Sequence, residues 1–419
     1  MAPNPYSPHS MVHTALPPLP GSPAPGALSN LRILDIGTMV AGPVACTFLA
    51  DFGAEVIKVE QPSGGDTLRG LGPFKNGESL WWCLEGRNKK SVTIDLRQKE
   101  GQDLLLSLVA KADAIVENFR PGTLESWNLG YDRLAEVNPR LVMLSVSGFG
   151  QSGPYAKRAG YDRMGLAFSG VMGITGYPDR PPVRLGISVA DYSTATMGAF
   201  AVMMALYHRD RGGPGQHIDL SLYETMFRYT DSMVGSYSAL GKRRARTGNV
   251  HQAAAPGDNF ETRDGRFIVL TVSGDTLFRK LCAAIGQSAL ADEPRFATHS
   301  SRFENIEELN ATVAQWMRSR DTADIREILD GAGVAYSVIY TVEDIVEDPH
   351  YNARENIIGV EHPVAGMVQM PGVVPKMSGT PAAQPAAAPT LGAHNDEILK
   401  GLLGLGDAEV DRLREAKVI

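Results

Sequence analysis

The sequence predicts an α/β protein whose larger part is a doubly wound parallel sheet, joined to a smaller α/β domain. Short apolar runs alternate with helical patterns from residue 31 to about residue 146, and glycine, proline or acidic residues bound the runs. Strands that alternate with helices pair in parallel, and the helices cover both faces of the sheet. Hydrophobic residues make up 43% of the 419 residues, which is enough apolar material for a sizeable core.

The individual elements follow in order along the chain. The predicted helices of the first part are Pro43–Phe52, with proline near its start, and Gln102–Ala112, with leucines on one face. Ligands of open parallel sheets bind beyond the carboxyl ends of the strands, so the functional site is expected there. The predicted strands are Arg32–Gly37, Glu55–Glu60, Ser91–Leu96, Ala114–Glu117 and Leu141–Val146.

Composition indicates the domain boundaries. The proline-rich start of the chain has too few apolar residues to order itself and is expected to be disordered. A new unit with one strand and several amphipathic helices is expected from about residue 233. The predicted division is a tail at 1–28, a large Rossmann-like domain at 29–205, a linker at 206–232, a small domain at 233–332, a return linker at 333–355 and the C-terminal part of the large domain at 356–419.

Charge and cysteine content restrict the partners. With 40 basic and 47 acidic residues the net charge is −7, which argues against nucleic acid or an anionic membrane as a partner. The three cysteines are scattered and form no CxxC pair, as in a cytoplasmic protein with reduced thiols. The longest apolar segment, Gly198–Tyr207, is shorter than the roughly 20 residues of a membrane helix and indicates a core helix.

Several catalytic and cofactor signatures are missing from the sequence. It contains no GxGxxG after the first strand, no P-loop, no HExxH, no GxSxG, and no His and Cys residues at metal-binding spacing. The turn Gly64-Gly65-Asp66 with the cation Arg69 is by itself typical of ordinary loop chemistry. Asp162, which follows Tyr161, is on local sequence alone more typical of a helix cap.

A series of ordered motifs changes the interpretation of Asp162. Together these motifs resemble the class III coenzyme A (CoA) transferase family, whose members include formyl-CoA and carnitine CoA-transferases, and the resemblance runs from Leu31 to Ile419. The motifs are Val40-Ala-Gly-Pro43, Leu49 to Glu60, Gly64-Gly-Asp66 with Arg69, Asn88-Lys-Lys-Ser91, Glu117-Asn-Phe-Arg-Pro-Gly122, Ser147 to Pro154, Tyr161-Asp162 and Leu391-Gly-Ala-His394.

The resemblance implies a function and a set of site residues. It implies a transferase that moves CoA from an acyl-CoA donor such as succinyl-CoA to a carboxylic acid, with a CoA thioester as substrate and no tightly bound cofactor. We take Tyr161-Asp162 as the position of the family's catalytic aspartate, which makes Asp162 the expected nucleophile. The CoA contacts that the resemblance implies, all in the large domain, are Val40, Ala41, Arg87, Asn88, Asn118, Phe119, Arg120 and Ser147.

A carboxylate is sufficient for this chemistry, because a thioester is already activated. An aspartate with a pKa of roughly 4 is ionised at neutral pH and attacks without a general base. Attack on acyl-CoA gives a mixed anhydride and CoA thiolate. The thiolate then attacks the aspartyl carbonyl and leaves an aspartyl-CoA thioester, from which the acceptor acid takes CoA by the reverse steps.

Departures from the family pattern bear on specificity. Leu166 stands where members often carry glutamine, and Val40 stands where some do. The segment Gly248–Gly257 has few glycines at the place of the glycine-rich lid of oxalate-specific members, which argues against oxalate specificity. Basic side chains near the expected site favour a dicarboxylic acceptor such as succinate, malate or a substituted succinate: Arg158, Arg163, Arg184 and His251.

Two alternatives remain open at the level of the sequence. The fold implied by the sequence also resembles that of 2-methylacyl-CoA racemases. These enzymes need two bases: a histidine, where this chain has Tyr161, and an aspartate, at the position of Asp191. Tyrosine, with a pKa of about 10, is a poor base at neutral pH, so we expect transfer and take Asp191 as a helix cap. The assembly implied by the resemblance is an interlocked homodimer, or a heteromer with a homologous subunit.

Overall fold

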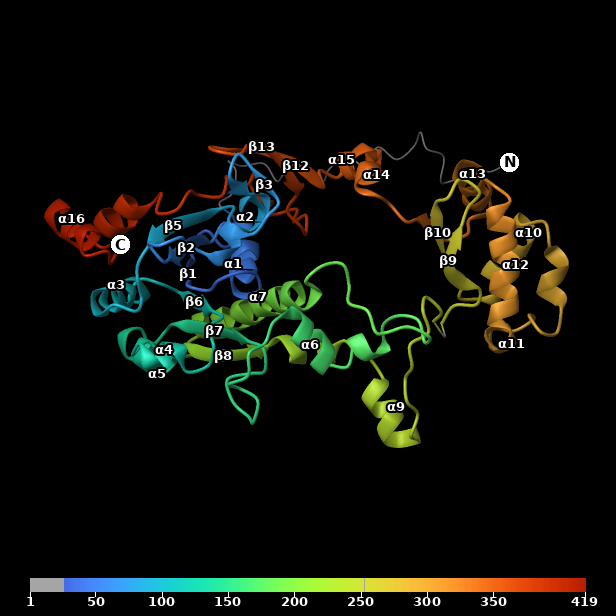
Figure 1. The fold of residues 1–419 in the computed structure, drawn as a ribbon, viewed down its shortest axis with the longest axis horizontal. Helices are drawn as coiled ribbons and strands as arrows, with labels where there is room; N and C mark the ends of the chain where they lie inside the picture. Colours follow the sequence, from blue (N-terminus) through green and yellow to red (C-terminus); the bar gives the residue numbers. More distant parts are fainter. Residues whose placement is uncertain (1–25, 252) are drawn as a thin grey trace. The chain divides into compact units, whose positions relative to one another are not determined.

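The computed structural model describes residues 26–251 and 253–419, and its chain divides into two units (Figure 1). Among the described residues, unit 1 comprises 26–169, Leu185–Thr230 and Glu355–Ile419, and unit 2 comprises Gly170–Arg184 and the described part of Asp231–Arg354. Most of the predicted disordered tail, residues 1–28, lies outside the described residues. Its last residue, Leu28, donates a backbone hydrogen bond to the carbonyl of Phe52 at 3.0 Å.

Unit 1 is built on a six-stranded sheet in which every neighbouring pair is parallel. This confirms the predicted doubly wound α/β fold. The strands, in their order across the sheet, are β5 (Lys89–Thr93), β2 (Glu55–Glu60), β1 (Arg32–Asp35), β6 (Ala114–Glu117), β7 (Val142–Ser147) and β8 (Gln216–Ser221).

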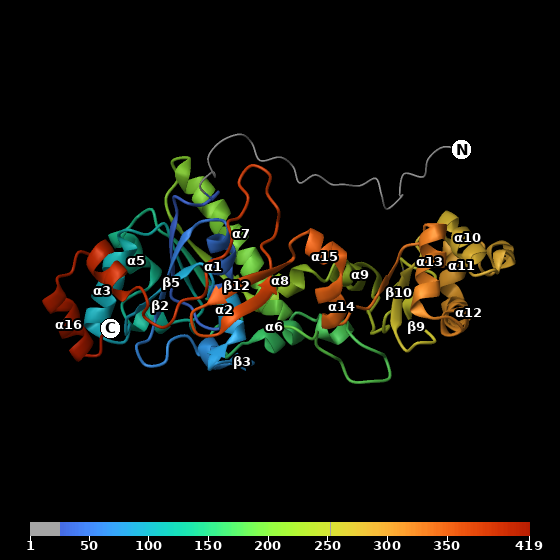
Figure 2. The ribbon, with the colours of Figure 1, turned by 90° about the horizontal axis from the view of Figure 1, so that it is seen from above.

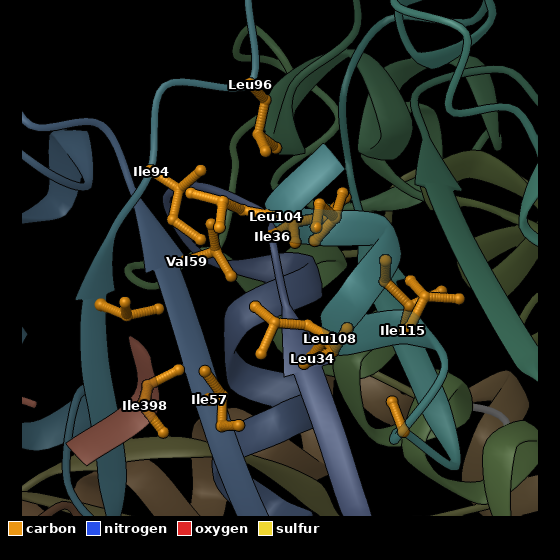
Figure 3. Packing of buried hydrophobic residues seen from close by; sticks show 14 of the residues in the cluster. Leu34, Ile36, Ile57, Val59, Ile94, Leu96, Leu104, Leu108, Ile115 and Ile398 are labelled. Carbon is orange, nitrogen blue, oxygen red and sulfur yellow. The ribbon is translucent and has the colours of Figure 1, made fainter. Parts of the chain in front are cut away.

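One face of the sheet is covered by helices from the middle and the end of the chain, which Figure 2 shows beside the strands. These are α3 (Lys99–Val109), α5 (Tyr131–Val137), the π-helical segment η4 (Glu397–Leu402) and α16 (Asp407–Glu415). Their apolar side chains join those of the strands in a single buried cluster, and each fully buried side chain of this size contributes about 1.5–3 kcal/mol. Figure 3 labels Leu34, Ile36, Ile57, Val59, Ile94, Leu96, Leu104, Leu108, Ile115 and Ile398 of this cluster.

The other face is covered by α1 (Ala41–Asp51) and α7 (Val189–Asp210). Ile33 points to this face, because successive side chains of a strand point to opposite sides. Helix α7 approaches the sheet closely at Gly198, where an added Cβ would lie 2.8 Å from Cδ2 of Leu144. The apolar run predicted to be a core helix therefore packs on the sheet as part of α7.

Helix α7 has the length and composition of a membrane-spanning helix, and it is one such helix among the described residues. A core helix can have the same length and composition. Here one side of α7 is buried in the core of unit 1, through residues from Ala190 to Arg209.

Strand β8 lies within residues 206–232, which were expected to be a linker. Its sequence, Gln-His-Ile-Asp-Leu-Ser, is mostly polar, since it forms an edge of the sheet and is largely exposed. An edge strand with one covered face lacks the apolar run that identifies a central parallel strand. The chain runs from β8 into α8 (Leu222–Arg228), also in unit 1.

Unit 2 contains a three-stranded antiparallel sheet covered by amphipathic helices. The strand order is β11 (Tyr336–Val338), β10 (Phe267–Thr271), β9 (Gly257–Glu261). The other helices of this unit are α9 (Met233–Leu240), α11 (His299–Glu304), α14 (Val342–Glu347) and α15 (Pro349–Ala353), and those that pack on the sheet are α10 (Asp275–Ala284), α12 (Ile306–Arg318) and α13 (Thr322–Ala332).

Candidate active site

A cavity of about 210 Å³ opens in unit 1 beyond the carboxyl ends of β1, β6 and β7. This is the place where open parallel sheets bind ligands. We call it the strand-end cavity. Its lining residues are Thr38, Met39, Val40, Ala41, Asn118, Phe119, Arg120, Pro121, Val146, Ser147, Gly148, Arg158, Ala159, Gly160, Tyr161, Asp191 and Leu222.

Six of the eight predicted CoA-contact residues meet in this cavity. The first two belong to the start of α1, and the others follow β6 or end β7. Their convergence follows from topology, because parallel strands place their carboxyl ends at one edge of the sheet. The six are Val40, Ala41, Asn118, Phe119, Arg120 and Ser147.

The other two predicted contacts, Arg87 and Asn88, do not line the cavity. Arg87 is buried, and its guanidinium donates two hydrogen bonds to the carboxylate of Asp51, at 2.9 and 2.5 Å. Asn88 donates to the same carboxylate at 2.8 Å and accepts from the backbone N–H of Ala386 at 2.7 Å. The side chains of both residues therefore hold neighbouring segments of unit 1 together.

The carboxamide of Asn118 fixes the backbone of one cavity wall. It accepts from the N–H of Thr38 and donates to the carbonyl of Thr38, each at 2.7 Å. The preceding residue, Glu117, is buried and accepts from the N–H of Phe119 at 2.7 Å. Burial raises the pKa of Glu117 to about 7.

Asp162, the predicted nucleophile, is the first residue of helix α6 (Asp162–Phe168) and is 8% exposed. Its Oδ1 accepts the backbone N–H of Ala190 at 2.8 Å and that of Asp191 at 3.3 Å. These are free N–H groups in the first turn of α7, whose own preceding residue, Ser188, makes no side-chain cap. The carboxylate of Asp162 is therefore the cap of α7, supplied by another helix.

Asp191 belongs to the first turn of α7, its backbone N–H is bound by Asp162, and the residue lines the strand-end cavity. Burial, together with the like charge of Asp162, raises the pKa of Asp191 to about 7. The N-terminus of α7 thus brings two carboxyl groups together, and of these two residues Asp191 forms part of the cavity wall.

Tyr161 also lines the cavity and is 63% exposed. Arg158, another lining residue, places its guanidinium 3.8 Å from the centre of the Tyr155 ring. Arg184 and His251, considered above as acid-binding groups, belong to unit 2.

A second cavity, of about 310 Å³, lies next to the first and shares Thr38 and Phe119 with it. Sequence reasoning missed its lining residues Gln61, Ser63 and Trp127. The signal that marks this place is the Gly64-Gly65-Asp66 turn, because Gly65 and Asp66 also line the second cavity.

A doubly wound unit with a carboxyl-bearing cavity at its strand ends suits an enzyme that acts on an already activated acid. The model of CoA-transferase family III matches residues 28–395, so the chain belongs to this family and is a CoA-transferase. The resemblance found in the sequence is thereby confirmed. The CoA thioester is a substrate, and this family needs no tightly bound cofactor.

Curated relatives agree with this assignment. Succinyl-CoA–D-citramalate CoA-transferase of Chloroflexus aurantiacus is 45% identical over 396 residues, which cover 94% of this chain and 98% of the relative. The beta subunit of succinyl-CoA–L-malate CoA-transferase from the same organism is 39% identical, with the same coverage. Succinate–glutarate CoA-transferase of Agrobacterium fabrum is 36% identical and is matched over 90% of this chain and 95% of its own length.

Among solved structures, a CaiB/BaiF family protein from Brucella suis superposes with a TM-score of 0.81. It is 34% identical, and the match covers 90% of this chain and 99% of that protein.

The capping contact predicts a loss of stability on Asp162→Ala. Removing a side-chain helix cap costs about 1–2 kcal/mol, because an N–H group of the first turn loses its partner. Asp162→Asn keeps an acceptor oxygen and is expected to lose less than half as much. Urea unfolding of the two variants measures the difference, and equal losses would contradict the capping role.

Proposed function

We propose that this enzyme transfers CoA from succinyl-CoA to a second dicarboxylic acid, with Asp191 as the carboxylate that carries CoA between them. The observation that carries the proposal is that Asp191 lies in the wall of the cavity lined by six expected CoA contacts. The names of similar enzymes support the substrates, since they pair succinyl-CoA with D-citramalate or L-malate.

The predicted nucleophile was Asp162, and the geometry favours its neighbour for two reasons. One oxygen of Asp162 already accepts two backbone N–H groups, and Asp162 is not part of the cavity wall. The N-terminus of α7 is already capped by Asp162, so the carboxylate of Asp191 is not needed as the cap of its own helix. We therefore assign attack to Asp191 and helix capping to Asp162.

The reaction then proceeds by four exchanges at carbonyl carbons. The carboxylate of Asp191 attacks succinyl-CoA, which forms a mixed anhydride and expels CoA thiolate. The thiolate attacks the aspartyl carbonyl, which forms aspartyl-CoA and releases succinate. The acceptor carboxylate attacks aspartyl-CoA, and the thiolate expelled again attacks the acceptor carbonyl, which regenerates Asp191.

The two neighbouring cavities provide a place for the CoA thioester. They share Thr38 and Phe119, so together they extend along the strand ends of unit 1. Arg120 and Arg158, both exposed at the first cavity, offer positive charge to the CoA phosphates. Thr38 lines both cavities, and the wall of the second cavity includes the apolar residues Ile94 and Leu96.

We also propose that the enzyme is a cytoplasmic homodimer. The relative with 45% identity carries no subunit designation in its name, whereas the malate-specific relatives are named as alpha and beta subunits. Helix α7 exposes three large apolar side chains at a spacing of four and three residues, which places them on one helix face. These are Phe200, Met204 and Tyr207, each at least half exposed in the single chain, and a second copy of this chain is the partner that would cover them.

The three cysteines are free and buried, as suits a reducing compartment.

The first prediction of this proposal separates the two aspartates. The wild-type enzyme is expected to convert succinyl-CoA and D-citramalate or L-malate into succinate and the new thioester. Asp191→Asn should lose this activity by about a thousandfold or more, since the group that carries CoA is removed. Asp162→Asn, the matched control, should retain transfer. Chromatography of the thioesters measures the rates, and borohydride reduction of the succinyl-CoA-treated enzyme should label Asp191.

The opposite pattern would return the nucleophile to Asp162. A wild-type enzyme that transfers CoA to none of a panel of dicarboxylic acids would contradict the proposed substrates.

The second prediction concerns pH. The nucleophile must be ionised, and burial with the charge of Asp162 raises the pKa of Asp191 to about 7. The value of kcat/KM should therefore fall as the pH is lowered through 7. Asp162→Asn removes one of the two causes, so the pKa of Asp191 falls and the acid limb moves to lower pH. A pH–rate profile that is the same in both enzymes would contradict the electrostatic coupling.

The third prediction is that the purified chain is a dimer in solution. Light scattering coupled to size exclusion should give twice the 45.1 kDa chain mass. Exchange of Phe200 and Met204 for serine should weaken the dimer, because the exposed face of α7 loses apolar area. A fully active monomer at micromolar concentration would contradict the assembly.

A further inference from the structure

The turn Gly64-Gly65-Asp66, with Arg69, supplies no reacting group in the proposed mechanism, yet many hydrogen bonds and ion pairs tie it into unit 1. It follows β2 and leads into the short helix η1 (Thr67–Gly70). The guanidinium of Arg69 donates to both oxygens of Glu60 at 2.7 and 2.8 Å. Gly65 has φ +69°, and a Cβ there would lie 2.7 Å from Oε2 of Glu60, so only glycine fits.

This turn buries the carboxylate of Asp66, which is 2% exposed. Its Oδ1 accepts the N–H of Leu68 at 2.9 Å, within its own turn, and the N–H of Met39 at 2.8 Å, across unit 1. Its Oδ2 lies 2.8 Å from the ammonium of Lys58, which is also fully buried. The ion pair holds the carboxylate in one orientation, so that Oδ1 faces Met39.

The hydrogen bond to Asp66 matters at Met39 because the backbone of Met39 has an unusual conformation. Its φ is +66°, in the left-handed region that side chains other than glycine rarely adopt. The residues on either side are held as well: Lys58 donates to the carbonyl of Gly37 at 2.5 Å, and Asn118 holds Thr38 by two hydrogen bonds. The segment Gly37–Val40 is thus fixed at three successive residues by side chains from three other places in the chain.

The same segment forms a wall of the strand-end cavity, through Thr38, Met39 and Val40, and continues into Ala41 at the start of α1. We infer that Asp66 is a positioning residue for CoA binding: it holds Met39 in the left-handed conformation and so keeps this wall in its binding shape before CoA arrives. The inference rests on the proposed binding of CoA in this cavity.

A role in folding alone would require only that the charge of Lys58 is compensated. Asp35 does this only in part, because its Oδ1 lies 3.2 Å from the same ammonium while its Oδ2 lies 2.9 Å from the ammonium of Lys89. Asp66 therefore also contributes to stability. The contact that Asp35 does not make is the one to Met39, and this contact acts on the cavity wall. Affinity for CoA, rather than stability, is therefore the property that distinguishes the two roles.

The test compares Asp66→Ala, which removes the acceptor for Met39, with Asp66→Asn, which keeps an acceptor oxygen but loses the charge. Both variants should unfold at lower temperature than the wild type. Titration with free CoA should show a Kd raised about tenfold for Asp66→Ala, as the loss of one buried hydrogen bond predicts, and about threefold or less for Asp66→Asn. The value of kcat at saturating succinyl-CoA should change little in either.

The matched control is Asp113→Asn, which breaks another ion pair to a buried arginine. Asp113 lies 2.9 Å from Arg209 and precedes β6, at the end of the sheet opposite to the cavity. This variant should lose stability while its Kd for CoA stays at the wild-type value. If Asp66→Ala and Asp113→Asn lower the melting temperature alike and neither changes the Kd, Asp66 has no positioning role.

A measurement on the wild-type protein makes the test independent of how the variants fold. Hydrogen exchange of the peptide that contains Met39 should be slow in the free enzyme and unchanged when CoA is added. Rapid exchange in the free enzyme that becomes slow only with CoA would overturn the inference, because the ligand would then order the wall. A wild-type enzyme that binds no CoA but exchanges slowly at Met39 would contradict the proposed function. It would still agree with a rigid Gly37–Val40 segment held by Asp66.

Discussion

The buried ion pairs of Lys58 with Asp35 and Asp66 are the constraint on which the site depends. Burial lowers the pKa of a lysine, but the charges of Asp35, Asp66 and Glu60 outweigh this effect and hold the pKa of Lys58 above its ordinary value. Removal of one partner from a buried pair costs about 3–5 kcal/mol, so the arrangement is strongly specified. It joins the ends of β1 and β2 to the segment that begins α1. Helix α1 then packs with α7, and the first turn of α7 carries Asp191.

Charge at the other side of the cavity follows a different principle. The N-terminus of α7 attracts negative charge, because its first N–H groups are unpaired and carry partial positive charge. Two carboxyl groups lie there, and they repel each other. Asp162 accepts the backbone hydrogen bonds of the first turn of α7, whereas Asp191 is partly buried and its pKa is raised to about 7. A more basic carboxylate is a better nucleophile, so the capping of α7 and the proposed reactivity of Asp191 have one cause.

The sequence predicted the central part of this architecture and lost accuracy where patterns are short or polar. Central strands such as β6 and β7 are buried on both faces, so their apolar runs identify them. Edge strand β8 is polar and was assigned to a linker. Helix α6 ends at Phe168, before Gly170, which takes φ +86°, and only a short helical turn follows at Met172–Ile174. Periodicity alone does not reveal such a break.

Side-chain roles show the same division between what a motif specifies and what only the fold determines. The motif around Asn118 was predicted to line the site, and it does, because its place after β6 fixes its position at the strand ends. Arg87 was expected to line the site too, but its guanidinium forms a buried ion pair with Asp51 instead. For Asp162, local sequence favoured a helix cap and family resemblance favoured a nucleophile. The structure shows a cap, although of α7 rather than of its own helix, and such a cap from a distant segment has no signature in the neighbouring residues. The side chain of Asp162 thus accepts a hydrogen bond from the backbone of a second acid, Asp191, 29 residues further along the chain.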